Sequence, residues 1–232
     1  MNPAANRPMT TASRNPVDVF DGRTFDAVLF DMDGTLISSI HVTERCWGVW
    51  MQEYGYQPEH YHQFHGTPAR AIIEQLVPQE DREAAFQRIL ALEMGSTDGI
   101  ITMAGAAEAV AAIPPSRRAI VTSSTRDLAL VRLGLTGLGM DTMVTADDVD
   151  NGKPHPDPFL LAARLLGVDP QRCLVIEDAP SGLRAGRAAG CATLGVPGTH
   201  NLEDLDADAV IESLDHIRFI YDDMAGIRII AA

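Results

Sequence analysis

The residues best suited to chemistry in this 232-residue chain begin with two aspartates that follow a short apolar run. Asp31 and Asp33 stand directly after the run Ala27–Phe30, and Gly34 and Thr35 come next. Such a pair can serve one metal ion. Its first carboxylate can attack phosphorus to form an aspartyl-phosphate, and its second can move a proton. Gly34 lets the backbone turn. Plain Asp-Gly turns use the same residues, so this motif alone leaves both interpretations open.

A second polar group follows another apolar run. Thr122, Ser123 and Ser124 come after Ala119–Val121 and before a helical pattern. A hydroxyl and the backbone N–H groups at a helix N-terminus can together hold phosphate oxygens. Because Ser and Thr are also common helix N-caps, capping is the simpler interpretation of this group taken alone.

The basic residues of the chain are lopsided, with 17 arginines and a single lysine, Lys153. That lysine stands in Gly152-Lys153-Pro154, ahead of a helical pattern. Where arginine fills every other basic position, a retained ammonium indicates that a compact point charge is needed. Chance survival of a surface lysine is the alternative.

Two adjacent acids form the fourth group. Glu177 and Asp178 come directly after the apolar run Cys173–Ile176. Mg²⁺ prefers carboxylate oxygens and water, so adjacent acids at a strand end suit it. The alternative is that Asp178 only caps a helix that starts near Pro180.

A sheet must bring these groups together. Apolar runs alternate with helical patterns along the chain, which predicts an α/β fold with a Rossmann-like, doubly wound parallel sheet. Such sheets bind ligands beyond the carboxyl ends of their strands, where all four groups stand. The predicted strands are 27–30, 119–121, 143–144, 173–176, 192–194 and 209–211, and the predicted helices between them are 105–113, 126–133, 157–167 and 181–189.

Residues 38–101 follow a different pattern. They hold helical segments near 41–54, 68–77 and 80–94 and no strand-like run. We therefore expect an α-helical cap at 38–101, inserted into a core made of 25–37 and 102–232. Residues 1–24 predict a flexible N-terminal tail. Near the end of the chain, 227–230 suit either an edge strand or a docked tail.

Composition narrows the partners. The formal net charge of −14 argues against nucleic acid and anionic membranes, which need a basic face. It still permits an anionic small molecule, because a metal ion and one cation can reverse the potential locally. No membrane span or secretory signal is evident in the sequence. Cys46, Cys173 and Cys191 cannot form a disulfide framework, so we expect free thiols in a reducing cytoplasm. The sequence leaves the oligomeric state open.

Together the four groups resemble the haloacid dehalogenase superfamily, in its sugar-phosphatase-like and β-phosphoglucomutase-like branch with a helical cap after the first motif. The resemblance covers roughly 25–217 and keeps the family's motif order. It implies a phosphomonoester hydrolase that uses Mg²⁺ and an aspartyl-phosphate intermediate. It rests on Asp31-Met-Asp33-Gly-Thr35, Thr122-Ser123, Gly152-Lys153-Pro154 and Glu177-Asp178-Ala-Pro-Ser-Gly182.

The resemblance also implies roles for the catalytic residues. Asp31 is then the nucleophile that becomes phosphorylated, and Asp33 is the general acid and base. Thr122 binds the transferring phosphoryl group. Lys153 neutralises that group and orients Asp31.

The implied metal ligands overlap with these residues. Asp31 and Asp178 would hold Mg²⁺, together with the backbone carbonyl of Asp33. Glu177 would assist directly or through water. The remaining residues expected around the phosphate are Gly34, Thr35 and Ser123.

Asp33 and the cap residues distinguish between the branches of the family that this sequence resembles. Dehalogenases of the superfamily lack the second aspartate, which this chain has as Asp33. Phosphonate-cleaving relatives need a cap lysine, and 38–101 contain none. Sugar phosphomutases generally carry an arginine in the cap loop where this chain has Ala69, with Arg70 one position later. This difference favours a phosphatase over a mutase.

Residues of the cap loop are the candidates for contact with the substrate. His65 and Gly66 resemble the caps of polyol-phosphate and deoxysugar-phosphate phosphatases, and Arg70 is expected near the substrate with them. The sequence thus predicts a phosphatase of a small phosphorylated sugar or polyol. A β-phosphoglucomutase-like mutase and a catalytically silent binding module are the alternatives.

Overall fold

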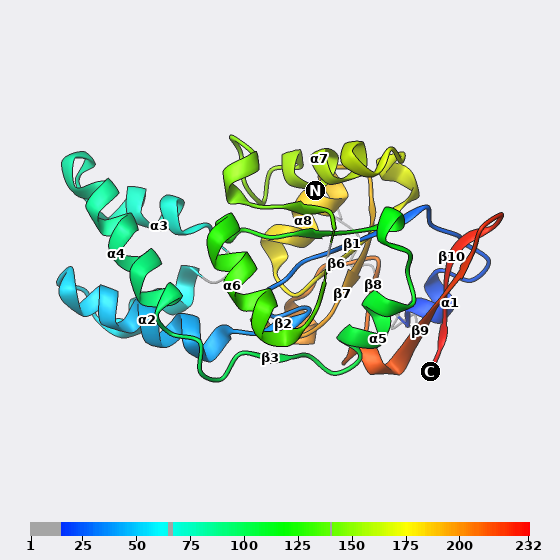
Figure 1. Cartoon of the computed structure of the whole chain (residues 1–232), viewed down its shortest axis with the longest axis horizontal. Coiled ribbons are helices and arrows are strands. Elements are labelled where there is room, and N and C mark those ends of the chain that lie inside the picture. The colour runs from blue at the N-terminus through cyan, green and yellow to red at the C-terminus, as the bar shows by residue number, and fades with distance from the viewer. Residues whose placement is uncertain (1–14, 65–66, 140) are drawn as a thin grey trace, which may run out of the picture.

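The computed structural model describes residues 15–64, 67–139 and 141–232. Its centre is a six-stranded sheet in the order β5-β4-β1-β6-β7-β8, and every neighbouring pair of strands is parallel (Figure 1). The strands of this sheet are β1 (Ala27–Phe30), β4 (Arg118–Val121), β5 (Met143–Val144), β6 (Cys173–Glu177), β7 (Ala192–Gly195) and β8 (Ala209–Val210).

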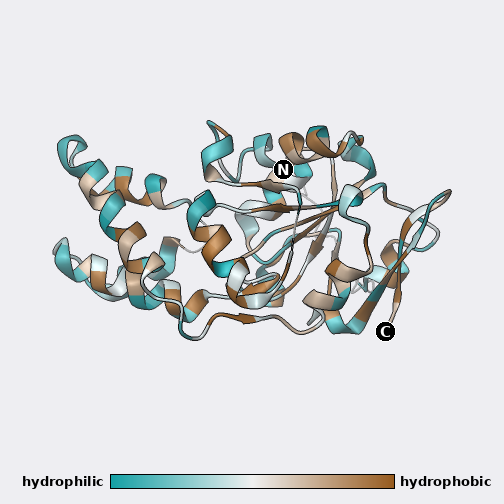
Figure 2. Cartoon of the chain, viewed as in Figure 1, coloured by the Kyte–Doolittle hydropathy of each residue, from teal (hydrophilic) through white to brown (hydrophobic). Residues whose placement is uncertain are grey.

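Successive side chains of the central strands point to opposite faces of the sheet, and both faces carry a hydrophobic core. All four residues of β1 are buried. Val28 and Phe30 belong to one hydrophobic cluster, whereas Ala27 and Leu29 belong to another. Because both faces are covered, these strands are apolar throughout rather than alternating with polar residues. Figure 2 shows hydrophobic residues along the central strands and a mixture of hydrophobic and hydrophilic residues in the helices around them.

Helices cover the two faces. Phe159 of α7 (Asp157–Leu166) and Ala185 of α8 (Pro180–Ala188) lie in the cluster of Ala27. Ala109 of α5 (Ala106–Ala111) lies in the cluster of Val28. The predicted doubly wound α/β core is therefore confirmed. The helices are α1 (Pro16–Val19), α2 (Ile40–Glu53), α3 (Ala69–Leu76), α4 (Arg82–Met94), α5 (Ala106–Ala111), α6 (Arg126–Thr136), α7 (Asp157–Leu166) and α8 (Pro180–Ala188). The 3₁₀ turns are Pro58–Phe64, Gln79–Asp81, Pro115–Arg117, Ala146–Asp148, Pro170–Arg172, Leu202–Asp204 and Leu214–His216.

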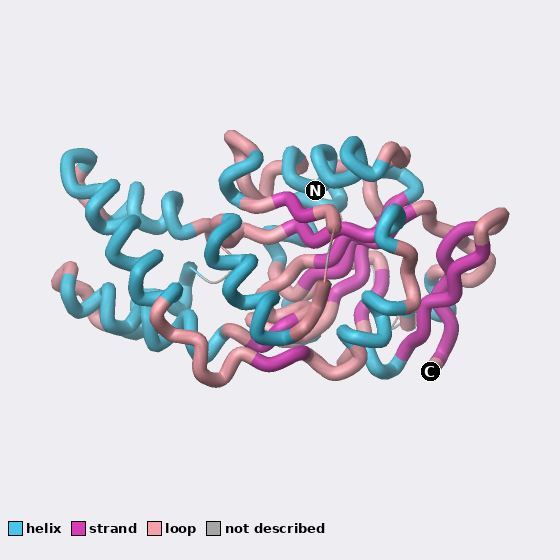
Figure 3. Tube along the Cα trace, in the orientation of Figure 1, coloured by secondary structure: helices cyan, strands magenta, loops and turns pink. Residues whose placement is uncertain are grey.

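A helical cap projects from the carboxyl edge of the sheet and consists of α2, α3 and α4 (Figure 3). Trp47 and Trp50 of α2 are buried inside it, with Trp47 stacked on Tyr61 at 5.1 Å between ring centroids. Trp50 Nε1 donates to the carbonyl oxygen of Ala85 in α4 at 2.9 Å. Trp47 and Trp50 belong to the same hydrophobic cluster as Val28 and Phe30, so the apolar interior of the cap is continuous with one side of the core.

Two short strands join the cap to the core, and they correct one expectation. β2 (Ile37–Ser38) pairs antiparallel with β3 (Ile101–Thr102). Residues 38–101 were expected to hold no strand, yet Ser38 and Ile101 lie in this ladder. Two residues are too few to show a period of two, so the pattern could not reveal it.

The expected N-terminal tail is ordered over the part that the structure describes. Asn15 caps α1 by accepting a hydrogen bond from the N–H of Val17. Phe20 is buried and packs edge-on against Phe25, with 5.4 Å between the ring centroids. The burial of Phe20 thus holds a segment whose polar composition predicted a flexible tail. Residues 1–14 of the predicted tail lie outside the described residues.

The end of the chain forms a hairpin of β9 (Ile217–Asp222) and β10 (Gly226–Ala231). Ile227 bridges to Phe25 in antiparallel fashion. Residues 227–230 are therefore a strand paired within a separate two-stranded sheet. No helix within the described ranges has the length and apolar character to cross a bilayer.

Candidate active site

β1 lies between β4 and β6, and this order brings the polar residues after these strands to one edge of the sheet. Phe30 is in register with Ile120 on one side and with Ile176 on the other. The N–H of Asp31 continues the ladder by donating to the carbonyl oxygen of Ile176 at 2.9 Å. A crevice opens at this edge of such a sheet, where ligands bind.

Lys153 is buried at the centre of this crevice. Its ammonium Nζ donates to Asp31 Oδ1 at 2.7 Å, to Glu177 Oε1 at 2.6 Å and to the carbonyl oxygen of Val121 at 2.7 Å. An ammonium has three donors, so all of them are used. Burial opposes the charge, but the carboxylates of Asp31 and Glu177 outweigh it and raise the pKa of Lys153. The lysine is therefore a fixed positive charge.

Asp31 presents one carboxylate oxygen without a protein partner. Its Oδ1 is bound by Lys153, whereas Oδ2 is buried and has no hydrogen-bond partner among the described residues. Burial, and next the charge of Glu177, raise the pKa of Asp31 to about 7. A buried, unpaired carboxylate oxygen is costly unless a ligand completes it. Asp31 is thus placed to meet an electrophile or a cation.

Asp178 is held by a threonine from another loop. Its Oδ2 accepts from the N–H of Thr199 at 2.6 Å and from Thr199 Oγ1 at 2.7 Å. Burial, and next the charge of Asp31, raise the pKa of Asp178 to about 7. The two aspartates therefore repel each other when both are ionised, which a cation between them would relieve.

Glu177 is held on both oxygens by the protein. Oε1 accepts from Lys153, and Oε2 accepts from the N–H groups of Asp178 and Ala179 at 3.1 Å each. Burial raises its pKa. These contacts favour Glu177 as the anchor that positions Lys153 and the following turn.

The three acids form a candidate metal centre. Asp31, Glu177 and Asp178 each offer an oxygen, and these oxygens all lie within 4.8 Å of one another. The hard carboxylate donors, and the unpaired Oδ2 of Asp31, fit Mg²⁺. Asp31 and Asp178 are the side chains best placed to hold it, and the backbone carbonyl of Asp33 remains a predicted ligand.

The side chain of Asp33 lies outside that metal cluster. Its Oδ1 accepts from Ser39 Oγ at 2.6 Å and from Arg132 Nη1 at 2.8 Å, and its Oδ2 accepts from Ser124 Oγ at 2.9 Å. The two aspartates of the first motif thus have separate surroundings. One faces the lysine and the metal site, and the other faces the hydroxyl-rich side, which suits proton transfer to a substrate oxygen.

Gly34 lies against Asp178 of the metal cluster, and Thr35 follows it in the chain. Gly34 has φ +89°, and a Cβ there would lie 2.0 Å from Asp178 Oδ2. Thr35 is buried. Neither residue lines the cavity described below, and a contact of Gly34 or Thr35 with phosphate stays a prediction. Gly34 allows Asp178 to approach the loop.

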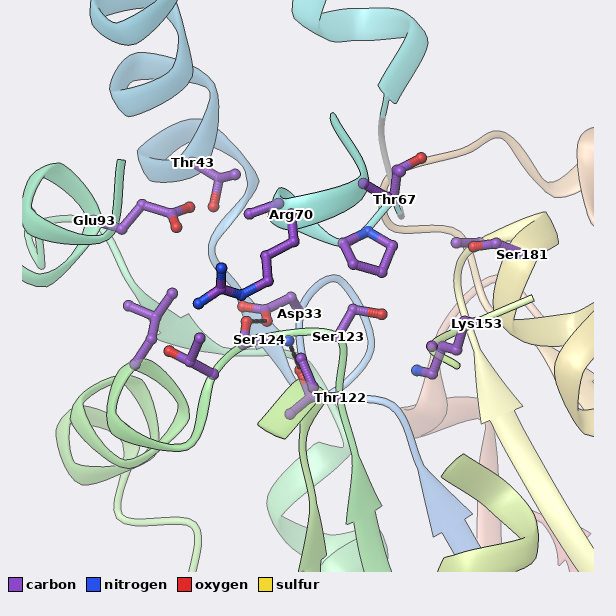
Figure 4. Close-up of a pocket in the computed structure, with 18 of the residues that line it drawn as sticks. Asp33, Thr43, Thr67, Arg70, Glu93, Thr122, Ser123, Ser124, Lys153 and Ser181 are labelled. Atoms are coloured by element: carbon purple, nitrogen blue, oxygen red, sulfur yellow. Dashed lines mark hydrogen bonds between the residues drawn. The ribbon is translucent and has the colours of Figure 1, made fainter. Parts of the chain in front are cut away.

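Thr122 and Ser123 stand at the end of β4, beside Lys153 and Asp33 (Figure 4). Thr122 is buried, and its Oγ1 accepts from the N–H of Ser124 at 3.1 Å. Thr122 and Ser123 both line the cavity, as the expected phosphate contact requires.

A cavity of about 380 Å³ lies between the cap and the core. The core side of the cavity includes Asp31, Asp33 and Lys153. The cap contributes Thr43, Thr67 and Glu93 among others. Figure 4 shows these side chains around the labelled core residues. A small polar ligand would touch both parts of the molecule.

Arg70 is engaged inside the cap. Its Nη1 donates to Glu83 Oε2 at 3.0 Å, and its guanidinium lies 3.7 Å above the centre of the Phe86 ring. Arg70 also lines the cavity, so a contact with substrate stays a prediction. His65 and Gly66 lie outside the described residues.

The site also contains three residues that the sequence motifs do not mark, namely Arg132, Glu93 and Thr199. Arg132 is only 3% exposed and lies on the inner face of α6. A signal for it did exist, because it follows Leu128 by four positions and Ala129 by three and so shares their buried face. No sequence signal marked Thr199, which reaches Asp178 from a distant loop.

The described geometry suits displacement at phosphorus. A buried carboxylate with an unpaired oxygen stands beside a fixed ammonium and a candidate Mg²⁺ site, and a second carboxylate faces the cavity. Positive charge near the transferring phosphoryl group and a positioned proton carrier are what this chemistry requires.

Comparison with known proteins gives consistent relatives. The family model described as haloacid dehalogenase-like hydrolase matches residues 25–190. Hexitol phosphatase A of Escherichia coli (strain K12) is 38% identical over 200 residues, which are 82% of this chain and 91% of that protein. Glycerol-1-phosphate phosphohydrolase 2 of Saccharomyces cerevisiae is 31% identical over 227 residues, with 85% of this chain and 91% of that protein covered. The solved structure of a hydrolase from Pseudomonas syringae has a TM-score of 0.75 at 25% identity, covering 82% of this chain and 94% of that chain.

Proposed function

The chain belongs to the haloacid dehalogenase-like hydrolase family, and from this premise we propose that it is a Mg²⁺-dependent phosphatase of a small phosphorylated sugar or polyol. The observation that carries the proposal is the carboxylate of Asp31. One of its oxygens is bound by Lys153, and the other is buried and has no hydrogen-bond partner in the described part of the chain. It lines a cavity in which Asp33 offers a second carboxylate.

In the first half of the reaction, a carboxylate oxygen of Asp31 attacks phosphorus. The bond between phosphorus and the sugar or polyol oxygen breaks, and an aspartyl-phosphate forms on Asp31. Asp33, as its carboxylic acid, donates its proton to the leaving oxygen. Lys153 keeps Asp31 oriented and offsets the negative charge of the phosphoryl group.

In the second half, water attacks the aspartyl-phosphate. Asp33, now a carboxylate, accepts a proton from that water, and the bond between phosphorus and Asp31 breaks. Inorganic phosphate leaves, and both aspartates return to their starting forms. A positioned acid–base group typically contributes on the order of 10²–10⁴ in rate.

Mg²⁺, when bound, supplies positive charge to the phosphoryl oxygens and lowers the repulsion between the substrate and the acidic cluster. Asp31 and Asp178 would hold it, with Thr199 fixing Asp178. Glu177 accepts hydrogen bonds from Lys153 and from the backbone N–H of Ala179, and these bonds hold the lysine and the turn after β6 in place.

The lining of the cavity supports the substrate class. Thr43 and Thr67 of the cap and Ser124 of the core offer hydroxyl groups, and Glu93 offers a carboxylate. Such groups exchange hydrogen bonds readily with a polyhydroxylated leaving group. The names of the two relatives, a hexitol phosphatase and a glycerol-1-phosphate phosphohydrolase, point to the same class.

Phosphate release from a panel of sugar, polyol and nucleoside monophosphates tests the proposal. We expect release with Mg²⁺ from sugar or polyol phosphates and little from nucleotides. Asp31→Asn should abolish turnover while leaving the circular dichroism spectrum unchanged. Undiminished turnover by this variant contradicts the proposed nucleophile.

The same panel separates the alternatives. A mutase would yield an isomeric sugar phosphate in place of free phosphate, so both products are measured. A binding module would release no phosphate from any ester and yet bind one of them.

We also propose that the protein works in the cytoplasm. This rests on its three buried, free cysteines, which suit a reducing compartment. The net charge of −14 supports a small-molecule partner over nucleic acid.

A further inference from the structure

A buried arginine ties the acid–base aspartate to the cap. Arg132 belongs to α6 of the core, and its Nη1 donates to Asp33 Oδ1 at 2.8 Å. Its Nη2 donates to Thr43 Oγ1 of α2 at 3.0 Å and to Glu93 Oε1 of α4 at 3.2 Å. One guanidinium therefore contacts the proposed proton carrier and two cap helices.

The cap residues are arranged around this guanidinium. Figure 4 shows the carboxylate of Glu93 pointing toward Thr43, on the cap side of Asp33 and Ser124. Glu93 is buried together with Arg132. Thr43 and Glu93 of the cap thus accept hydrogen bonds from Nη2 of Arg132, while Nη1 donates to Asp33.

A buried ion pair is a weak source of stability, because desolvation offsets much of the attraction. Such a pair is better suited to fixing one arrangement of its partners. A planar guanidinium can serve several acceptors at fixed angles, which an ammonium cannot do in the same way. The arrangement fixed here is that of Asp33.

The remaining contacts of Asp33 make it dependent on this arginine. Without Arg132, Oδ1 keeps only Ser39 Oγ and Oδ2 keeps only Ser124 Oγ as partners from the contacts described. Both are hydroxyl groups, which rotate freely and also accept hydrogen bonds. Among the residues that the structure describes, Arg132 is the one charged donor to this carboxylate.

We propose that Arg132 is a positioning residue that orients Asp33 for proton transfer, and that Glu93 and Thr43 hold Arg132 in place when the cap is seated on the core. This inference rests on the proposed phosphatase reaction. Its consequence is that the seating of the cap and the placement of the proton carrier are coupled through a single side chain.

The test compares two esters of similar shape whose leaving groups differ in their need for a proton. Phenyl phosphate releases a poor leaving group, whereas p-nitrophenyl phosphate releases a good one that departs without protonation. For Arg132→Met we expect kcat/KM to fall by about 100-fold with phenyl phosphate and by less than about 5-fold with p-nitrophenyl phosphate. Arg132→Lys should recover part of the loss with phenyl phosphate.

A purely structural arginine would give another result. Equal losses with the two esters, or no loss with either, overturn the positioning role. An arginine that only binds substrate hydroxyl groups would also leave the ratio between these two esters unchanged, because neither carries such groups.

A second variant covers the chance that Arg132→Met does not fold, since it strands the charge of Glu93. The double variant Arg132→Met/Glu93→Gln removes both charges and should fold, as thermal melting can verify. We expect it to show the same selective loss with phenyl phosphate. A double variant that folds and keeps the wild-type ratio overturns the proposal.

Glu93→Gln alone tests the part played by the cap. This variant keeps the contact of Arg132 with Asp33 but weakens the contact of Arg132 with α4. We therefore expect kcat/KM to fall by about 10-fold with phenyl phosphate and not with p-nitrophenyl phosphate. If Glu93→Gln keeps the wild-type ratio of kcat/KM between the two esters, the cap does not help to position Asp33. The matched control is Arg88→Met, which breaks an exposed cap pair with Glu53 and should leave both esters unaffected.

Failure of this inference is distinguishable from failure of the proposed function. If the wild-type protein releases no phosphate from any ester, the proposed function fails. If the wild-type protein is active and Arg132→Met loses both aryl esters equally, only the positioning role fails.

Discussion

Lys153 Nζ lies 2.7 Å from Asp31 Oδ1, so the only lysine of the chain is the direct partner of the proposed nucleophile. The same ammonium holds Glu177 at 2.6 Å, which connects the loop after β1 to the end of β6. The single lysine in the composition is thus the residue that binds both acids of the site.

Removing that charge should damage both activity and stability. Lys153→Met leaves Asp31 and Glu177 buried without their cation. We expect phosphate release to fall by at least ~100-fold and the free energy of unfolding to fall by about 3–5 kcal/mol. Phosphate assays and urea denaturation measure the two effects.

The matched control is Arg187→Met, which breaks an exposed pair with Asp206. That variant should lose less than about 1 kcal/mol, because surface ion pairs contribute little. Equal stability of the two variants would contradict the importance assigned to Lys153.

The buried aspartates predict how stability depends on pH without metal. Burial raises the pKa of Asp31 and of Asp178 from 3.8 to about 7. The folded state then binds more protons than the unfolded state between these values, so this contribution to the free energy of unfolding falls as pH rises from about 4 to about 7. Urea denaturation in EDTA at pH 5 and pH 7.5 measures this trend.

Mg²⁺ should reverse the trend. Because it binds the ionised carboxylates, it should stabilise the protein more at pH 7.5 than at pH 5. The control is Asp178→Asn, in which the pH trend and the effect of Mg²⁺ should both shrink. Stabilisation by Mg²⁺ of equal size at the two pH values would argue against binding at this cluster.

Thr199 should influence metal affinity without touching the metal. Its N–H and Oγ1 both donate to Asp178 Oδ2, so Thr199→Val removes one of two orienting bonds. We expect Mg²⁺ affinity to weaken by about 10–100-fold, measured from the Mg²⁺ dependence of phosphate release. Thr199→Ser keeps the hydroxyl and should stay near wild type, whereas equal losses in the two variants would assign the effect to packing.

Gly34→Ala should destroy the site, because it places a Cβ 2.0 Å from Asp178 Oδ2 at a φ of +89°. Gly55→Ala is the control, since its φ is +80° and its Cβ would meet nothing within 4 Å. The control should lose only the backbone term of roughly 1–2 kcal/mol and keep full activity. A Gly34→Ala variant that retains activity would mean that Asp178 is not needed where the structure places it.

Much of the site could be predicted because its residue types are conspicuous at strand ends. The run Ala27–Phe30 predicts a doubly buried strand. The carboxylates that follow it could form a plain turn, and the other three groups at strand ends favour the chemical interpretation. The lysine stood out for its rarity alone. These signals are local, and the parallel order of the sheet brings them together.

Other features depended on distances that no local pattern encodes. Arg132 resembles an ordinary helix arginine until α6 is packed against the cap. Thr199 reaches Asp178 across 21 positions. The ordered segment after residue 14 is joined to the far end of the chain, because Phe25 bridges to Ile227, and no pattern near Phe25 encodes that contact.

The central claim is that Asp31 becomes phosphorylated during turnover. The most direct measurement is mass spectrometry of an acid-quenched reaction of Asp33→Asn with p-nitrophenyl phosphate, whose leaving group needs no proton. Loss of the base should slow hydrolysis, so we predict that the protein gains one HPO₃ unit and that the peptide containing Asp31 carries it. Release of p-nitrophenol without any phosphorylation of Asp31, or phosphorylation of another residue, would contradict the account.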